Sequence, residues 1–164
     1  MEKAWEHCEE EQVWQCYMTE ADIYLQSHQP KEAEKYFSQA LQKCPDRSEI
    51  LFNIAIAYSS AGYYDVAIEL LEDVWTIFGT EEGKFVVPYL ADCYLHKFRQ
   101  EPDHSKARDH DIKCFLLYLK LAPMCDREAT IHLFRERFPT LKPEDYYAYA
   151  HKEIYGTFPE DHVY

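Results

Sequence analysis

Apolar and small residues recur along the first half of the chain with a period of about 34 residues. The first copy of the pattern is an aromatic, a small, a large apolar, a small and a helix-ending residue, at Tyr24, Ala33, Phe37, Ala40 and Pro45. The equivalent positions 34 residues later are Tyr58, Ala67, Leu71, Val74 and Gly79. A bulky aromatic on one helix packs against a small alanine on the next, and periods of this length indicate helix pairs that stack as a solenoid. The pattern predicts helical hairpins at about 14–47 and 48–83.

A third, longer hairpin is predicted at 84–124, where Val87, Leu90 and Tyr94 repeat the apolar spacing. About eight extra residues fall near 97–110, where charged residues and Pro102 interrupt the periodicity. Two further amphipathic segments, about 126–138 and 143–155, would cover the last apolar face, as terminal helices of solenoids do. We therefore expect residues 1–164 to form a single all-α domain.

Local signals support several helix boundaries. Asp46 followed by Glu49 is a capping-box pattern, and Asp126 is a candidate N-cap. Pro143 suits the first position of a helix. Pro88 fits only if its helix begins near 80–84, so that the proline stays close to the first turn.

The spacing within each hairpin resembles that of the tetratricopeptide repeat family. The matching positions are Tyr17, Ala21, Tyr24, Ala33, Phe37, Ala40 and Pro45, then Leu51, Ile54, Ala55, Tyr58, Ala67, Leu71 and Val74. Two positions depart from the family pattern: Glu20 replaces an apolar residue, and Gly79 replaces the terminal proline. The resemblance implies a right-handed superhelical solenoid that acts as an adaptor or scaffold and binds a peptide or partner helix in a concave groove.

In the family, the groove is lined by the first helix of each repeat. Carried onto this chain, its main partner-binding positions are Met18, Asp22, Glu49, Phe52, Asn53, Ile56, Phe85, Tyr89, Asp92 and His96, with Gln15, Thr19, Gln26 and Ser60 beside them. The apolar members would hold apolar side chains, Asn53 would bond a peptide backbone, and the carboxylates would favour Lys or Arg. The alternative is that the chain's own termini cover this surface.

Charge is distributed unevenly. Residues 1–83 carry 17 acidic and 5 basic side chains, net −12, whereas the remainder is nearly balanced and the whole chain has a net charge of −13. Such a surface repels phosphate backbones and anionic lipids, so we expect neither nucleic-acid nor membrane binding but a protein or peptide partner that is neutral or basic. The same acidity would also serve solubility alone.

Candidate chemistry is sparse in this sequence. Cys93 with His96, and His104, His110 and Cys114, have spacings from which a metal site is conceivable, but Cys114 lies in an apolar run typical of a core. Glycine-rich phosphate loops, GxSxG and HExxH are absent from the sequence. We therefore expect no enzyme activity, no metal and no cofactor. The six cysteines form no CxxC pair, which favours free thiols in a cytoplasmic protein.

Two alternatives to the adaptor role remain open. The protein would be a self-assembling structural protein if its groove were filled by its own termini, and its size and acidity also resemble small secretion chaperones. The Tyr-rich region after Pro143, with Tyr146, Tyr147, Tyr149 and Tyr155, would either cap the solenoid or dock a second copy as a homodimer.

Overall fold

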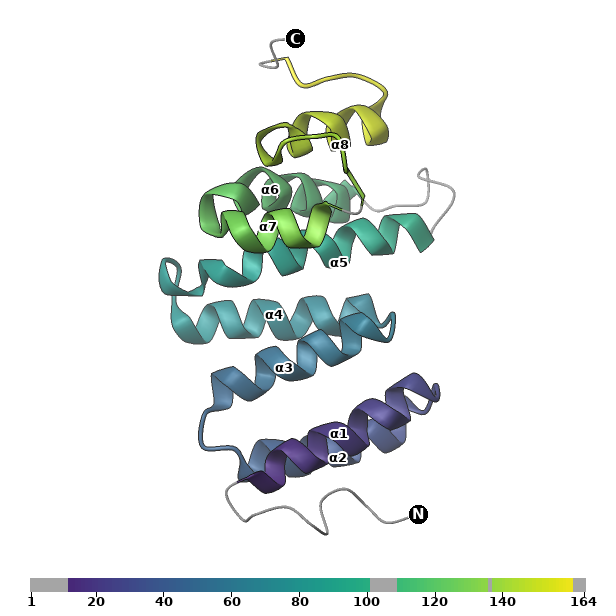
Figure 1. The fold of residues 1–164 in the computed structure, drawn as a ribbon, viewed down its shortest axis with the longest axis vertical. Helices are drawn as coiled ribbons and strands as arrows, with labels where there is room; N and C mark the ends of the chain where they lie inside the picture. The colour runs from purple at the N-terminus through teal and green to yellow at the C-terminus, as the bar shows by residue number, and fades with distance from the viewer. Residues whose placement is uncertain (1–11, 101–108, 136, 161–164) are drawn as a thin grey trace. The chain divides into compact units, whose positions relative to one another are not determined.

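The structure is a computed structural model that describes residues 12–100, 109–135 and 137–160, and these residues form helices and connecting turns without a strand. The chain divides into two compact units, Met1–Phe78 and Gly79–Tyr164. Each unit is described separately below. The expected all-α, helical-hairpin fold is confirmed (Figure 1).

The first unit consists of two helical hairpins. In the first, α1 (Val13–Gln26) packs on α2 (Pro30–Lys43), and in the second, α3 (Arg47–Ser60) packs on α4 (Tyr64–Phe78). The hairpins join where α3 contacts both α1 and α2. These hairpins span 13–43 and 47–78, and the sequence period predicted repeats at about 14–47 and 48–83.

The sequence period is visible in the turns within the two hairpins. His28 and Gly62 stand one period apart, and both have a positive φ, of +58° and +90°. Equivalent backbone hydrogen bonds close the turns: Gln29 N donates to Tyr24 O at 2.8 Å, and Tyr63 N donates to Tyr58 O at 2.9 Å. The repeat in sequence is therefore a repeat in backbone conformation.

The core of the first unit is built from the periodic positions. Ala33 and Ala67 are fully buried, as the close crossing of paired helices requires. Phe37 of α2 lies against Tyr58 of α3, with ring centroids 5.2 Å apart. This pair connects the two hairpins, because its rings come from neighbouring repeats.

The second unit contains a third hairpin and further helical segments. Its elements are η3 (Glu82–Val86), α5 (Val87–Gln100), α6 (Asp109–Cys125), α7 (Arg127–Phe134), η5 (Pro143–Asp145) and α8 (Tyr146–Tyr155). The α5 helix packs on α6, α7 contacts both helices, and α8 contacts α6. An ion pair also joins α5 to α6, since Lys97 Nζ lies 3.0 Å from Oδ2 of the buried Asp111.

The helix ends of the second unit differ in part from those expected. The α5 helix continues to Gln100, past the predicted break at 97. The α6 helix continues through Pro123 to Cys125, one residue beyond the predicted hairpin end at 124. A proline removes only its own N–H bond and strains one turn, so a helix can extend two residues beyond it. Pro88 is the second residue of α5, where it is tolerated. Residues 101–108 of the expected insertion lie outside the described part of the chain.

Both predicted aspartate caps are present. Asp46 Oδ1 accepts hydrogen bonds from Ser48 N at 2.9 Å and Glu49 N at 3.0 Å, and Asp126 Oδ1 accepts one from Ala129 N at 2.9 Å. These bonds satisfy N–H groups that a helix leaves unpaired at its start. The caps fix the beginnings of α3 and α7.

The cysteines only partly follow the expectation of free thiols. Within the described ranges, the cysteines that form no disulfide are Cys44, Cys93, Cys114 and Cys125. Cys16 is disulfide-bonded, which corrects the prediction of free thiols throughout. None of the described helices combines the length and apolar character needed to cross a lipid bilayer.

Candidate functional site: a groove between α1 and α3

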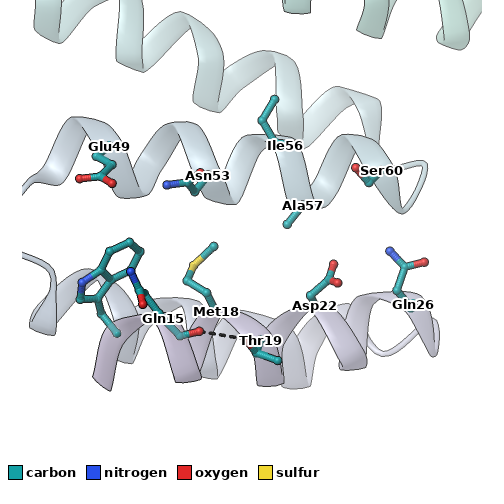
Figure 2. A pocket seen from close by; sticks show the side chains of 11 residues that line it. Gln15, Met18, Thr19, Asp22, Gln26, Glu49, Asn53, Ile56, Ala57 and Ser60 are labelled. Carbon is teal, nitrogen blue, oxygen red and sulfur yellow. Dashed lines mark hydrogen bonds between the residues drawn. The ribbon is translucent and has the colours of Figure 1, made fainter. Parts of the chain in front are cut away.

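The first unit has a groove of about 610 Å³ between α1 and α3 (Figure 2). The side chains that line it are Trp14, Gln15, Met18, Thr19, Asp22, Gln26, Glu49, Asn53, Ile56, Ala57 and Ser60. Its volume lies within the range of about 300–1,000 Å³ that is usual for ligand pockets.

Helical periodicity explains why these residues share one surface. On α1, Met18, Asp22 and Gln26 are four residues apart and so lie on one face, while Ala21 and Leu25 are fully buried on another. On α3, Glu49 and Asn53 are likewise four residues apart. The helical period therefore places lining residues along one face of α1 and along one face of α3, and these two faces are the walls of the groove.

The two walls use equivalent positions of successive repeats. Four positions on α1 have partners one repeat later on α3, and the pairs are Gln15 with Glu49, Thr19 with Asn53, Asp22 with Ile56, and Gln26 with Ser60. Within α1, Thr19 Oγ1 donates a hydrogen bond to Gln15 O at 3.1 Å. The groove is thus a product of the repeat itself.

The lining combines three kinds of side chain. Asp22 and Glu49 contribute carboxylates, and amides or hydroxyls come from Gln15, Thr19, Gln26, Asn53 and Ser60. The apolar lining residues are Trp14, Met18, Ile56 and Ala57. No lysine or arginine is among the described residues that line the groove. The surface can therefore hold apolar groups, hydrogen-bond a backbone and attract cations.

The predicted positions on α1 and α3 are nearly all brought together in the groove. Met18, Asp22, Glu49, Asn53 and Ile56 line it. Phe52, in contrast, is half-buried and is not among the lining residues.

Sequence reasoning missed two lining residues, Trp14 and Ala57. Trp14 stands at the start of the first repeat, and its position four residues before Met18 is a usable signal, because residues at i and i+4 share a helix face. Ala57 directly follows Ile56, and its small side chain carries no comparable signal in the sequence.

The remaining predicted site residues belong to the second unit. Phe85 lies in η3, and Tyr89 is a half-buried residue of α5. Burial, with a smaller effect of the Asp126 carboxylate, raises the pKa of the Tyr89 phenol. Asp92 and His96 lie further along α5, one helical turn apart.

Asp92 and His96 form a cluster with Arg137, which follows α7. Arg137 Nη1 lies 3.0 Å from Asp92 Oδ1, and His96 Nε2 lies 3.7 Å from Asp92 Oδ2. The arginine contact is an ion pair by distance without the angles of a hydrogen bond, since Oδ1 accepts none. Arg137 Nη1 instead donates to Leu133 O.

Burial shifts the titration of both ionisable groups on α5. It raises the pKa of Asp92 from 3.8 to about 6, although the Arg137 and Arg99 charges oppose the rise. It lowers the pKa of His96 from 6.5 to about 4, and the same arginines add to that decrease. Asp92 and His96 are therefore held in an environment that disfavours isolated charge.

The candidate metal ligands do not assemble into a site within the described residues. Cys93 is buried in the core, and Cys114 Sγ lies 3.7 Å from His110 Nε2. No group of three His, Cys, Asp or Glu side chains suited to a metal ion occurs in the described ranges, and His104 lies outside them.

The comparison with protein families identifies the repeats. Residues 24–83, from the end of α1 through α4 and into η3, match the profile described as tetratricopeptide repeat. This segment is similar to the tetratricopeptide repeat family. No match was found among the curated proteins or among the solved structures.

Tetratricopeptide repeats are generally modules for protein–protein interaction. In this chain the matched segment contains all of α3, and so one wall of the groove. The other wall, α1, lies almost entirely before the matched segment but repeats its spacing and its turn conformation.

Proposed function

We propose that this protein is an adaptor or scaffold that binds a peptide or a partner helix in the groove between α1 and α3, as a binding module and not as an enzyme. The observation that carries the proposal is the groove itself, whose lining residues come from equivalent positions of two repeats. The general role of tetratricopeptide repeats in protein interaction supports it.

The mixed lining also supports a protein partner. Protein interfaces combine apolar anchors with polar groups that fix orientation. Met18 and Ile56 provide such anchors, and Asn53 has both a donor and an acceptor for a peptide backbone. We further propose that the partner is neutral or basic, because the groove contains carboxylates and no basic side chain among its described lining.

The test is affinity capture from a lysate of the source cells with a groove variant, Met18→Ala with Asn53→Ala. The variant removes one anchor and one amide from opposite walls, and alanine is compatible with both helices. We expect it to lose the captured partner while its circular dichroism spectrum is unchanged, because both side chains lie on the groove surface.

The matched control is Gln39→Ala with Gln42→Ala, which makes two truncations at exposed positions of α2. This variant should retain the partner. Equal capture by the wild type and the groove variant would contradict the proposal, as would recovery of only further copies of the same chain, which would indicate self-assembly.

A further inference from the structure

The two carboxylates of the groove lie on opposite walls and at different heights along it. Asp22 belongs to α1 and Glu49 to α3 (Figure 2). Glu49 is the repeat equivalent of Gln15, so it lies at the level of Gln15 on the neighbouring helix. Gln15 and Asp22 are seven residues apart, and an α-helix rises about 1.5 Å per residue. The carboxylates are therefore separated by about 10 Å along the groove.

The stretch between the carboxylates carries Met18 and Thr19 on α1 and Asn53 on α3. Met18 is three residues beyond Gln15 on α1, and Asn53 is four residues beyond Glu49 on α3. A ligand that crosses this stretch would meet the thioether on one side and the amide on the other. In Figure 2 the Met18 side chain points from α1 toward the part of α3 that carries Asn53.

The polar lining favours an extended occupant over a helical one. Five of the lining residues carry amides or hydroxyls, which can bond the N–H and C=O groups of an extended backbone. A helix already satisfies these groups internally and would leave the lining amides unpaired. Side chains of an extended segment also alternate between two sides, and so they can reach both walls.

The period of an extended chain agrees with the placement of the carboxylates. Three residues of extended chain span about 10 Å, and residues at i and i+3 point to opposite sides. A cation at position i directed at Glu49 is thus followed by one at i+3 directed at Asp22. The residue at i+1 faces the α1 wall at the level of Met18, where an apolar side chain fits.

We propose that the groove binds an extended segment of a partner protein with Lys or Arg at two positions three residues apart and an apolar residue next to the cation that pairs with Glu49. This inference rests on the proposed function and specifies its partner. Charge complementarity supports it, because α1 contains no lysine or arginine and the described groove lining is free of both.

The experiment measures binding of capped synthetic peptides to the full-length protein by fluorescence polarisation. The probe is Gly-Ser-Lys-Leu-Thr-Lys-Ser-Gly, and its relatives place the lysines two or four residues apart or replace both by glutamate. We expect the i,i+3 peptide to bind about 1.4- to 5-fold more tightly than the other spacings and the glutamate peptide to bind least, because an exposed charge pair contributes about 0.2–1 kcal/mol. Binding should weaken as salt is raised.

The variant Asp22→Asn with Glu49→Gln should weaken binding of the i,i+3 peptide by about three- to tenfold, since it removes both attractive partners. The matched control is Asp65→Asn with Glu69→Gln, which makes the same charge change at exposed positions of α4 and should leave binding unchanged. Equal affinity for all spacings, tighter binding of the glutamate peptide, or no binding of any peptide would overturn the inference.

Failure of this inference is distinguishable from failure of the proposed function. If the cellular partner is lost from Met18→Ala with Asn53→Ala but retained by Asp22→Asn with Glu49→Gln, the groove binds proteins and the partner is not the cationic segment. Tightest binding by a helical peptide with lysines seven residues apart would overturn the extended conformation. If every groove variant still captures the partner and still binds the peptide, both proposals are overturned.

Discussion

At the scale of single residues, His28 occupies a position that its repeat equivalent fills with glycine. Both residues have a positive φ and are flanked by the same hydrogen bonds, yet only glycine adopts this conformation without steric cost. His28 is exposed, so no packing in the described structure requires its imidazole at this position. The first hairpin therefore carries local backbone strain that the second avoids.

Replacing His28 by glycine should stabilise the protein by about 0.5–1 kcal/mol. The left-handed conformation costs a residue other than glycine about 1–2 kcal/mol, and the greater flexibility of glycine in the unfolded chain offsets part of the gain. Urea unfolding would measure the change. The reciprocal variant Gly62→Ala should destabilise by a similar amount, and a stabilised Gly62→Ala would refute the argument.

Asp92 and His96 contribute to stability with opposite dependence on pH. The folded pKa of Asp92 is raised, to about 6 from 3.8, so its contribution is present below pH 3.8 and lost as pH rises through 6. The folded pKa of His96 is lowered, to about 4 from 6.5, so its contribution is present above pH 6.5 and lost as pH falls through 4. In the folded protein the pair therefore titrates with pKa values of about 6 and about 4. These are close to the values of 6.5 and 3.8 at which the same two groups titrate in the unfolded chain.

We therefore expect this pair to add little pH dependence to the stability of the wild-type protein, because the two contributions cancel. A variant that removes one of the two groups should show the pH dependence of the other. His96→Gln should gain stability as pH is lowered from 6 to 4, by no more than about 3 kcal/mol. Asp92→Asn should lose stability as pH is lowered from 6.5 to 4. Urea unfolding of wild type and both variants at several pH values measures the slopes, and parallel profiles for all three would contradict this account.

At the scale of elements, α8 closes the second unit through one buried tyrosine. Tyr146 is 2% exposed, and its ring centroid lies 5.5 Å from that of Phe134 and 5.3 Å from that of Phe138. Tyr149 and Tyr155 are 40% and 49% exposed. The same helix thus carries a packed aromatic and exposed ones, which separates a capping role from a docking role.

Tyr146→Ala should destabilise the protein by about 3–5 kcal/mol, as for other large aromatic-to-alanine changes in a core. Tyr149→Ala should change stability less, by about 1 kcal/mol, because the side chain is 40% exposed and its main ring contact is with Phe158. Thermal unfolding measures both effects. Sedimentation analysis of the Tyr149 variant would at the same time reveal any dimer that depends on this surface.

The sequence predicted elements best where apolar spacing was regular. The helices of the first unit followed from the repeat period, whereas the turns within the hairpins, at His28 and Gly62, were not among the predictions. The end of α5 did not follow from the pattern either, because Arg99 and Gln100 are good helix formers that continue the helix past the predicted break at 97. A charged run is a local preference, and tertiary packing overrides it.

At the scale of the whole molecule, the groove positions were predictable only as far as the period extends. Met18 and Asn53 followed from their place in each repeat, whereas Phe52, expected on the same face as Asn53, is not among the lining residues. Successive residues of a helix point about 100° apart, so a neighbour of a lining residue can lie on or off the lining face, and the repeat period alone does not decide which. The cluster of Asp92 and Arg137 was not predictable, since it joins α5 to a segment beyond α7 that no repeat pattern describes.

The ion pair between Lys97 and Asp111 joins the last turn of α5 to the first turn of α6. Its two residues flank the connection between Gln100 and Asp109. The entropic cost of closing a connection grows slowly, by about 0.6 kcal/mol for each doubling of its length. We therefore expect the chain to accept an affinity tag, a fluorescent reporter or an extra domain inserted in this connection, because the Lys97–Asp111 ion pair still joins α5 to α6.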